Sequence, residues 1–348
     1  MSVLIDTERK RYTPSGLQFF CDNLLRGLSE LAPGDISIYG PREAYGFPVE
    51  KFSPLHKLYN PIPKRYDIVH ITHQNQSYFP QKFGEQRVLT VHDLNYLHVS
   101  QADARTREKF IKQVACNIKM ADVIVCISEF TKDDLLSREE LFPGLSGKPV
   151  HVIYNGLDTH PTLTEEAIDR NLPEELKGKD FILNIGVANP KKNQQVIIEA
   201  MPLMDSDVVL VVNDPENAYA RFLKRRADDM NVADRLHIYA RIPEEVKYAL
   251  ISRSTAMVYP SLIEGFGYPP VEAMVCGTPV ILSRNGSLPE IGGDAAVYLK
   301  DTTPWEVDKA VRSLKIRTPD KGRIKAQAEK FSYRTMAANY LDLYRSLR

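Results

Sequence analysis

The chain has 348 residues, of which 43% are hydrophobic and 26% are charged. This length suffices for two domains of ordinary size, and the composition excludes an intrinsically disordered chain. The 45 basic and 45 acidic residues balance to a net charge of zero. Bulk attraction to nucleic acid needs a basic excess, so we expect no nucleic-acid partner.

The cysteines and the apolar segments indicate where the protein resides. The four cysteines are scattered and lack the close spacing of a metal site. The N-terminus has no long apolar core of a secretory signal. The longest apolar runs, such as residues 123–127 and 208–212, fall far short of the ~20 residues that cross a bilayer. We therefore expect a cytoplasmic protein with reduced cysteines.

Short β-branched segments alternate with stretches of helical length along the chain. The first series lies at residues 3–5, 35–40, 67–72, 87–93, 122–128 and 150–156. A second series follows at residues 181–186, 207–213, 235–240, 255–261 and 279–283. Apolar strands separated by helices are typical of parallel sheets covered by helices, so the pattern predicts an α/β fold.

A polar segment separates the two series. Residues 157–180 contain prolines and no strand signal, which is typical of a connection between domains. We place the boundary near residue 157. Residues 331–348 have apolar side chains at helical spacing, which predicts an amphipathic C-terminal helix. Open parallel sheets bind ligands outside the carboxyl ends of their strands, so two facing sheets would form a site in the cleft between them.

The segment PSLIEGFGYPPVEAMVCGTPVI, residues 260–281, holds two glutamates around a Gly-Phe-Gly turn. Glu264 precedes the turn, and Pro269-Pro270 then begins a short helix with Glu272 in its first turn. Glycines allow a ligand close to the backbone, and N–H groups at a helix start can hold anionic or hydroxyl oxygens. The simpler interpretation is that Glu272 complements the helix dipole and Glu264 is a solvated loop acid.

This segment resembles the signature of retaining family 4 glycosyltransferases with the GT-B fold, in which seven residues separate the two glutamates. The resemblance extends over nearly the whole chain, with further matching segments, in the order of the family, at residues 15–25, 90–97, 121–135, 152–158, 184–193 and 287–296. It implies two facing Rossmann-like domains, the first for the acceptor (1–157) and the second for a nucleotide sugar (158–330). The final helix (331–348) would pack back on the N-terminal domain.

The resemblance also implies roles for the residues of the loop. Glu264, with the backbone amides of Gly265, Phe266 and Gly267, would bind the donor sugar, and Glu272 would hold the ribose hydroxyls. A carboxylate can accept from two vicinal hydroxyls at once, and charge-assisted hydrogen bonds are stronger than neutral ones. The chemistry of the two glutamates agrees with this division.

A lysine near the start of the second domain supplies the opposite charge. Lys192 follows the strand-end Gly186 and can stabilise a diphosphate leaving group, with Lys191 as a weaker candidate. Many relatives carry arginine where this chain has Val187, so one phosphate contact is missing. Two solvated lysines that open a helix are the simpler interpretation. By the same resemblance, Gly16 would lie beside the diphosphate.

Histidines supply the candidates of the N-terminal domain. His92 ends a predicted strand, and the resemblance implies contact with the transferred sugar or the acceptor, although a lone histidine usually packs. Asp93 would orient His92 or cap the next segment. His70 and His73 have HxxH spacing, which is weak evidence for a metal without a third ligand. We expect no metal and no cofactor beyond the donor.

Other segments have less specific signals. The resemblance implies nucleobase contacts near Arg241, and Asn155-Gly156 would be a structural turn between the domains. Basic residues gather at Arg9, Lys10, Arg11, Arg105, Arg107, Lys109, Lys112 and Lys119. They form either a solvated face or a dock for an anionic membrane surface or a diphosphate-linked lipid acceptor.

The interpretation is a retaining, metal-independent hexosyltransferase with Glu264, His92 and Lys192 as its catalytic set. The donor would be a nucleotide diphosphate sugar, with mannose favoured, and the acceptor a glycan or a lipid-linked glycan. Such a reaction would serve surface polysaccharide biosynthesis, including lipopolysaccharide, at the inner membrane. The alternative is a non-catalytic nucleotide-sugar sensor. A nicotinamide-dependent dehydrogenase is disfavoured because no GxGxxG follows the first strand.

Overall fold

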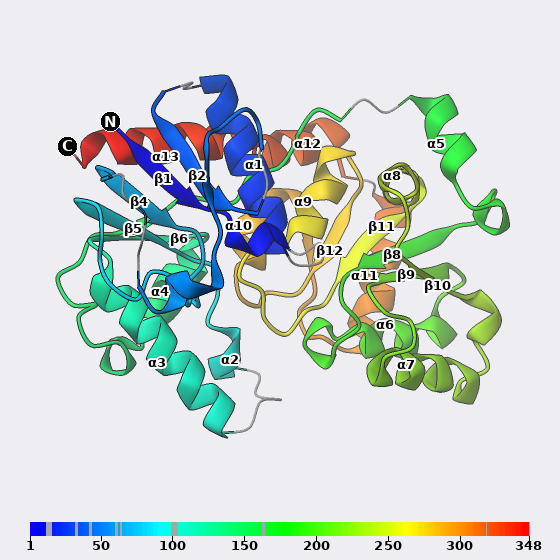
Figure 1. Cartoon of the computed structure of the whole chain (residues 1–348). Coiled ribbons are helices and arrows are strands. Elements are labelled where there is room, and N and C mark those ends of the chain that lie inside the picture. The colour runs from blue at the N-terminus through cyan, green and yellow to red at the C-terminus, as the bar shows by residue number, and fades with distance from the viewer. Residues whose placement is uncertain are drawn as a thin grey trace. The chain divides into compact units, whose positions relative to one another are not determined.

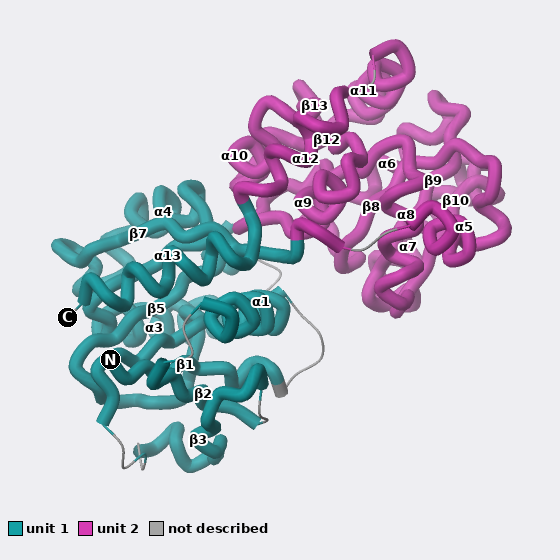
Figure 2. Tube along the Cα trace, turned by 90° about the horizontal axis from the view of Figure 1, so that it is seen from above, with its two compact units in different colours: residues 1–158, 331–348 teal, residues 159–330 magenta. Residues whose placement is uncertain are grey.

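The chain folds into two compact α/β units. The computed structural model describes residues 1–11, 16–31, 34–41, 44–59, 62, 65–98, 104–161, 164–317 and 319–347. Unit 1 comprises Met1–Asp158 and Phe331–Arg348, and unit 2 comprises Thr159–Lys330 (Figure 2). The predicted boundary lay between residues 157 and 158. The C-terminal segment therefore belongs to the same unit as the N-terminus.

Unit 1 is built on a parallel sheet (Figure 1). Among the described residues its seven strands have the order β3-β2-β1-β4-β5-β6-β7. They are β1 (Val3–Asp6), β2 (Ile36–Gly40), β3 (Val49–Lys51), β4 (Ile68–Ile71), β5 (Gln86–Val91), β6 (Val123–Cys126) and β7 (Val150–Val152). Strands β1, β2, β4 and β6 are buried along their whole length, as expected where helices cover both faces.

Helices cover the two faces of this sheet. They are α1 (Gly16–Leu31), α2 (Asn95–His98), α3 (Ala104–Met120), α4 (Glu129–Leu136) and α13 (Tyr333–Ser346), with the 3-10 helices η1 (Glu8–Arg11), η2 (Pro54–Lys57) and η3 (Glu139–Leu141). One core cluster joins Leu24 of α1 and Met336 of α13 to β1 and β2. Another joins Phe110 and Val114 of α3 to β4 and β5. Helices α1 and α13 thus pack together on one side of the sheet, and α3 packs on the other.

Unit 2 has a second parallel sheet, whose six strands in the described ranges have the order β10-β9-β8-β11-β12-β13. They are β8 (Phe181–Ile185), β9 (Asp207–Val212), β10 (Leu236–Ala240), β11 (Ala256–Tyr259), β12 (Val280–Leu282) and β13 (Val297–Tyr298). Its helices are α5 (Glu165–Asn171), α6 (Gln194–Ala200), α7 (Ala218–Asp229), α8 (Glu244–Arg253), α9 (Tyr268–Val275), α10 (Leu288–Gly292), α11 (Pro304–Ile316) and α12 (Lys321–Glu329). The 3-10 helices are η4 (Glu174–Leu176), η5 (Pro190–Lys192), η6 (Met201–Leu203), η7 (Ala233–Arg235) and η8 (Gly293–Ala295).

The polar segment 157–180 is more structured than a simple connection. It contains α5, which Thr164 caps by accepting from the Ala167 amide, and α5 packs against α8. Ile168 is buried there, and Arg253 of α8 pairs with Asp169 at 2.6 Å. A single buried side chain in a seven-residue helix leaves little periodicity to detect in the sequence. Within the described ranges, no helix has both the length and the apolar character that a membrane crossing demands.

A buried polar network fastens α13 to the sheet of unit 1. The ring of His70 in β4 lies 2.7 Å from the Tyr344 hydroxyl through Nδ1 and 2.7 Å from Thr90 Oγ1 through Nε2. Thr90 Oγ1 lies 2.8 Å from the hydroxyl of Tyr340. Burial lowers the pKa of His70 to about 3, so the ring is neutral in the folded chain. His70 is therefore a structural residue that connects two strands to the C-terminal helix.

The return of the chain into unit 1 depends on a glycine. A Cβ at Gly156 would lie 2.5 Å from the Cα of Tyr333 and 2.7 Å from the Ser332 carbonyl oxygen. Leu157 donates its amide to the Phe331 carbonyl at 2.9 Å, and Tyr333 donates to the Leu157 carbonyl at 2.9 Å. Two backbone segments meet here with no space for a side chain. The predicted structural turn at Asn155-Gly156 is thus a backbone-to-backbone contact inside unit 1.

The pKa of His70 makes stability depend on pH. The unfolded chain protonates this histidine below about pH 6.5, whereas the folded chain does so only near pH 3. The unfolded state then binds more protons, so the free energy of unfolding falls as the pH is lowered between these values. Urea titrations from pH 7 to pH 4 should show that His70→Gln reduces this slope by about 1.4 kcal/mol per pH unit.

The control for this titration is His151→Gln, because His151 is an exposed residue of β7. It should keep the slope of the unsubstituted chain. Equal slopes for His70→Gln and the unsubstituted chain would show that His70 is not buried in the neutral form.

Candidate functional site

Several predicted site residues gather in unit 2, where strands β8 and β11 end. Lys192 is the last residue of η5, which follows β8, and Glu264 lies in the loop after β11. Glu272 lies in α9, which follows that loop. The carboxyl ends of neighbouring parallel strands meet at one edge of a sheet, and β8 pairs directly with β11. The sheet topology therefore brings these residues to a common edge.

An ion pair forms the centre of this site. Lys192 Nζ lies 2.6 Å from Glu264 Oε1, and the two side chains are only 14% and 8% exposed. Burial opposes ionisation of Glu264, but Lys192 and then Lys191 outweigh it and hold its pKa below the ordinary value. Glu264 is therefore a carboxylate, which accepts hydrogen bonds and does not donate them.

Tyr259, the last residue of β11, completes the arrangement. Its hydroxyl accepts from Lys192 Nζ at 2.7 Å and also hydrogen-bonds Glu264. Burial raises its pKa well above the ordinary value, and the negative charges of Glu264 and Glu272 raise it further. Both carboxylates thus act on this phenol, which stays neutral. Tyr259 is not among the predicted site residues, although its place directly before the Pro-Ser of the motif was the available signal.

The turn after β12, at Gly286 and Ser287, packs against the backbone of the loop that contains Glu264, which we call the glutamate loop. Gly286 has a φ of +61°, and a Cβ there would lie 2.5 Å from the Glu264 carbonyl oxygen. The next residue, Ser287, donates its amide to that oxygen at 3.0 Å. Ser287 Oγ also lies 2.7 Å from the Phe266 carbonyl oxygen as a donor. These contacts hold the carbonyl groups of Glu264 and Phe266 in place.

The position of Glu272 differs from the prediction. Helix α9 begins at Tyr268, after Gly267 with a φ of +106° as N-cap, so Glu272 is the fifth residue and lies beyond the first turn. The two prolines occupy that turn, where their missing N–H groups cost nothing. Glu272 therefore does not complement the helix dipole. Its carboxylate accepts instead from Lys247 Nζ at 2.8 Å, a residue that the sequence analysis missed.

The other residues predicted to bind the donor lie around this edge. The side chain of Lys192 passes Gly186, where a Cβ would be 3.6 Å from Lys192 Cε. Val187 is 49% exposed. The backbone carbonyl of Lys191 accepts from the Leu262 amide at 2.8 Å and so fixes the start of the loop that holds Glu264. Arg241 follows β10, is exposed and has a φ of +54°. This place beside the sheet edge is compatible with the predicted contact of Arg241 with the nucleobase. That contact stays a prediction.

His92 and Gly16 belong to unit 1. His92 follows β5 and is 6% exposed, and its Nε2 lies 2.8 Å from the Thr72 carbonyl oxygen. A carbonyl only accepts, so Nε2 carries the proton and Nδ1 is an acceptor. Burial lowers the pKa of His92 to about 4, which keeps the ring neutral. Gly16 is the first residue of α1, and the rest of its predicted loop, residues 12–15, lies outside the described residues.

The neighbours of His92 have separate roles. Asp93 accepts from the Asn95 amide at 3.0 Å, so it caps α2. His73 accepts from the Asn75 amide at 3.1 Å through Nδ1, whereas His70 contacts Tyr344. The two histidines of the HxxH pattern thus have different surroundings. The described residues contain no group of three or more His, Cys, Asp or Glu side chains that could hold a metal ion.

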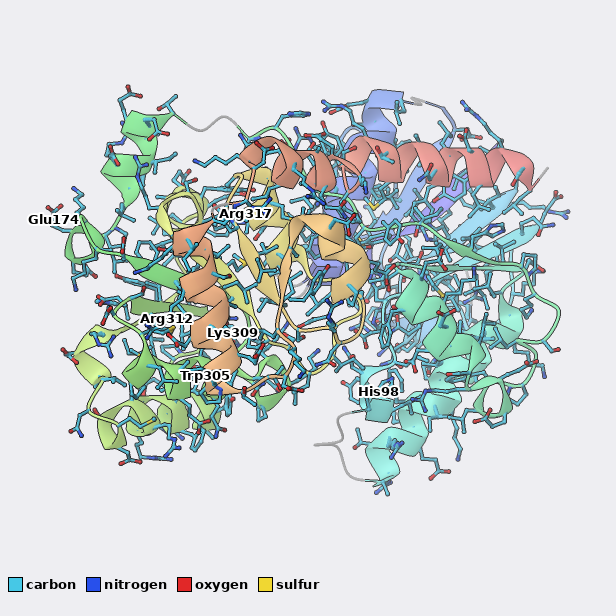
Figure 3. The ribbon with its side chains drawn as sticks, turned by 180° about the vertical axis from the view of Figure 1, so that it is seen from behind. His98, Glu174, Trp305, Lys309, Arg312 and Arg317 are labelled. Atoms are coloured by element: carbon cyan, nitrogen blue, oxygen red, sulfur yellow. The ribbon has the colours of Figure 1, made fainter. Side chains whose placement is uncertain are left out.

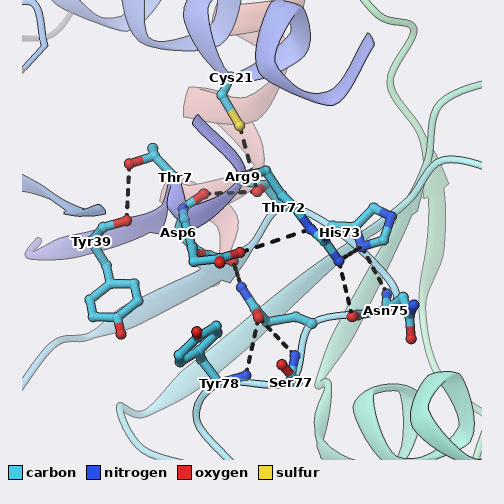
Figure 4. Close-up of polar contacts among 12 residues, drawn as sticks. Asp6, Thr7, Arg9, Cys21, Tyr39, Thr72, His73, Asn75, Ser77 and Tyr78 are labelled. Atoms are coloured by element: carbon cyan, nitrogen blue, oxygen red, sulfur yellow. Dashed lines mark hydrogen bonds and ion pairs between the residues drawn. The ribbon is translucent and has the colours of Figure 1, made fainter. Parts of the chain in front are cut away.

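A further polar cluster lies at the end of β1 in unit 1 (Figure 4). Asp6 accepts from the Gln76 side-chain amide and from the Glu8 amide at 3.0 Å. Gln76 Oε1 accepts from the amides of Ser77 and Tyr78 at 2.7 and 3.1 Å, so its NH₂ group faces Asp6. Burial raises the pKa of Asp6 to about 6. None of these residues was predicted, and an aspartate at the end of the first strand was the available signal.

Models of known families match both units of the chain. Residues 18–160 match "Glycosyltransferase Family 4", and residues 166–331 match "Glycosyl transferases group 1". The O-antigen chain mannosyltransferase B of Escherichia coli is 24% identical over 288 residues, which cover 80% of this chain and 74% of that protein.

Solved structures share the fold. Sucrose-phosphate synthase from Thermosynechococcus elongatus has a TM-score of 0.79 at 19% identity and covers 99% of this chain and 98% of its own. HepE from Anabaena, solved in complex with UDP-glucose, has a TM-score of 0.76 at 17% identity, with coverage of 99% and 100%. The predicted fold class, α/β with two parallel sheets of the GT-B type, is confirmed.

The close approach at Gly286 can be tested by adding one methyl group. In Gly286→Ala the new Cβ would meet the Glu264 backbone, so we expect the free energy of unfolding to fall by roughly 2–4 kcal/mol, from left-handed strain plus displacement of the loop. The control is Gly178→Ala, which also has a positive φ, +74°, but meets nothing within 4 Å. It should cost only about 1–2 kcal/mol. Equal losses in urea titrations would contradict the close approach.

Proposed function

We propose that this chain transfers a hexosyl group from a nucleotide diphosphate sugar to a hydroxyl acceptor, with retention of the anomeric configuration. The premise is that both units of the chain are glycosyltransferase domains of the GT-B fold. Unit 2 would bind the donor, and unit 1 would receive the acceptor.

The buried pair of Lys192 and Glu264 carries this proposal. A nucleotide sugar joins an anionic diphosphate to two groups rich in hydroxyls. The site offers the ammonium of Lys192, with a carboxylate beside it and a second carboxylate, Glu272, in the next helix. The ammonium suits the diphosphate, and carboxylates accept from vicinal hydroxyls. Glu264, with the backbone amides of residues 265–267, would then hold the hexose, and Glu272 the ribose.

Lys192 would act on the leaving group. As the bond to the sugar breaks, negative charge grows on the diphosphate, and a preorganised ammonium in a water-poor site stabilises that charge. We propose that this lysine and backbone amides supply the stabilisation, without a metal ion or another cofactor. Glu264 is bound to Lys192 and Tyr259, which favours a binding role for it over attack on the sugar. In that case the departing phosphate would accept the proton of the acceptor.

His92 would contribute from unit 1. Its ring is neutral, and its Nε2 is occupied by the Thr72 carbonyl oxygen. A hydroxyl of the transferred sugar or of the acceptor would therefore donate to Nδ1. Such a contact orients a substrate hydroxyl and requires no change of protonation near neutral pH.

We favour mannose from a guanine nucleotide as the transferred group. The support is the similarity to an O-antigen chain mannosyltransferase, while HepE shows that this fold also accommodates UDP-glucose. The acceptor would be a glycan or a lipid-linked glycan in surface polysaccharide biosynthesis, on the cytoplasmic side of the inner membrane. Helix α3, which carries Arg105, Arg107, Lys109, Lys112 and Lys119, offers a basic surface for peripheral contact with anionic lipids.

Replacing Glu264 tests the proposal. Glu264→Gln keeps the shape but removes the charge that Lys192 and the sugar hydroxyls require, so we expect release of nucleoside diphosphate to fall at least about 100-fold. Release is measured with GDP-mannose or UDP-glucose and a membrane extract as the source of acceptor. The control is Glu306→Gln, which removes an acid of α11 that pairs with Lys309 at 3.1 Å and should keep full activity.

Two results would contradict the proposal. One is a well-folded Glu264→Gln protein with full transfer activity. The other is tight binding of the nucleotide sugar by the unsubstituted chain without any release of nucleoside diphosphate, which would indicate a sensor.

A further inference from the structure

Lys247 occupies an unusual place in its helix. It is the fourth residue of α8 (Glu244–Arg253), in the turn where the helix dipole is positive. The positive end of the helix dipole stabilises acidic side chains in this turn, such as those of Glu244 and Glu245. It destabilises a cation at the same place. A lysine at this place needs a compensating negative charge.

Glu272 supplies that charge. Lys247 Nζ lies 2.8 Å from Glu272 Oε1 and 3.8 Å from the exposed Glu244, while the side chains of Lys247 and Glu272 are 19% and 8% exposed. The ammonium also lies 4.7 Å from the centre of the Tyr248 ring. Two charges taken out of water hold each other in place, and loss of either leaves the other uncompensated.

The pair repeats the arrangement at the other end of the loop. Each glutamate of the motif has one lysine within hydrogen-bond distance, Lys192 for Glu264 and Lys247 for Glu272. The two lysines come from different segments, η5 and α8. In the proposed function Lys192 stabilises the diphosphate, whereas Lys247 has no assigned role.

We propose that Lys247 is a positioning residue that fixes the Glu272 carboxylate for the 2′,3′-diol of a ribonucleoside diphosphate. This inference rests on the proposed function. A carboxylate can accept from two vicinal hydroxyls at once, and holding its plane in one orientation beforehand lowers the entropy cost of that contact. The bond from Lys247 to Oε1 sets that plane and leaves lone pairs of the carboxylate for the diol. Lys247 thereby determines the preference for ribonucleotides over 2′-deoxyribonucleotides.

Calorimetric titration with UDP, GDP and their 2′-deoxy forms tests this role on the full chain. The unsubstituted chain should bind at least one ribonucleotide roughly tenfold or more tightly than its 2′-deoxy form, because a charge-assisted hydrogen bond is lost. In Lys247→Met this ratio should fall towards one, through weaker binding of the ribonucleotide. Lys247→Arg should restore most of the ratio, which a purely structural role would not require.

A double variant separates positioning from direct contact. If Lys247 acts through Glu272, then Lys247→Met combined with Glu272→Gln should bind the ribonucleotide no more weakly than Glu272→Gln alone. The control is Lys309→Met, because Lys309 lies in the same unit on α11, near Trp305 and Arg312, and pairs with Glu306 (Figure 3). It should leave both affinities unchanged.

The outcomes distinguish the inference from the proposed function. An unchanged ratio in folded Lys247→Met, with tight binding of the ribonucleotide, overturns the positioning role and leaves the proposed function standing. A double variant weaker than Glu272→Gln also overturns it, in favour of direct contact. If the unsubstituted chain binds neither UDP nor GDP, the proposed function fails and the inference fails with it. If Lys247→Met does not fold, the ratio in Lys247→Arg decides, and a ratio near one overturns the inference.

Discussion

The site of unit 2 depends on one buried ion pair, that of Lys192 and Glu264. Two charges with little solvent are stable only when they are paired and further hydrogen-bonded, and here Tyr259 provides the additional bond. Removing one partner of such a pair typically costs about 3–5 kcal/mol. The pair therefore links the segment after β8 to the loop after β11. A ligand that enters this site has to replace or share the bonds of Lys192, which favours an anion as its partner.

The surrounding backbone keeps that pair at the edge of the sheet. Strands β8 and β11 are direct neighbours, so the segments that follow them start side by side. Gly286 and Ser287 support the loop from the other side, with the Ser287 amide 3.0 Å from the Glu264 carbonyl oxygen. These contacts hold the backbone of the loop, and Lys192 holds the carboxylate itself. Close packing against the Glu264 backbone thus explains the glycine at position 286.

Much of the fold could be predicted because its strands are apolar on both faces. The central strands, such as DVVLVV at 207–212, are buried over their whole length and give a clear signal. Strand β3 (Val49–Lys51) and strand β13 (Val297–Tyr298) were missed, because β3 has a single apolar residue and β13 is only two residues long. The motif residues Lys192 and Glu264 were predicted as a set, and they do contact each other. Tyr259 and Lys247 were not, because they lie outside the segments that resemble the family and their roles come only from tertiary contacts, across 67 and 25 residues of sequence.

The most direct test of the account is a crystal structure of the chain with GDP-mannose or UDP-glucose bound. We expect diphosphate oxygens within hydrogen-bond distance of Lys192 Nζ, hexose hydroxyls that donate to Glu264 and a ribose diol that donates to Glu272. A donor bound elsewhere on unit 2, with the Lys192–Glu264 pair intact and remote from it, would contradict the assignment of this edge as the donor site.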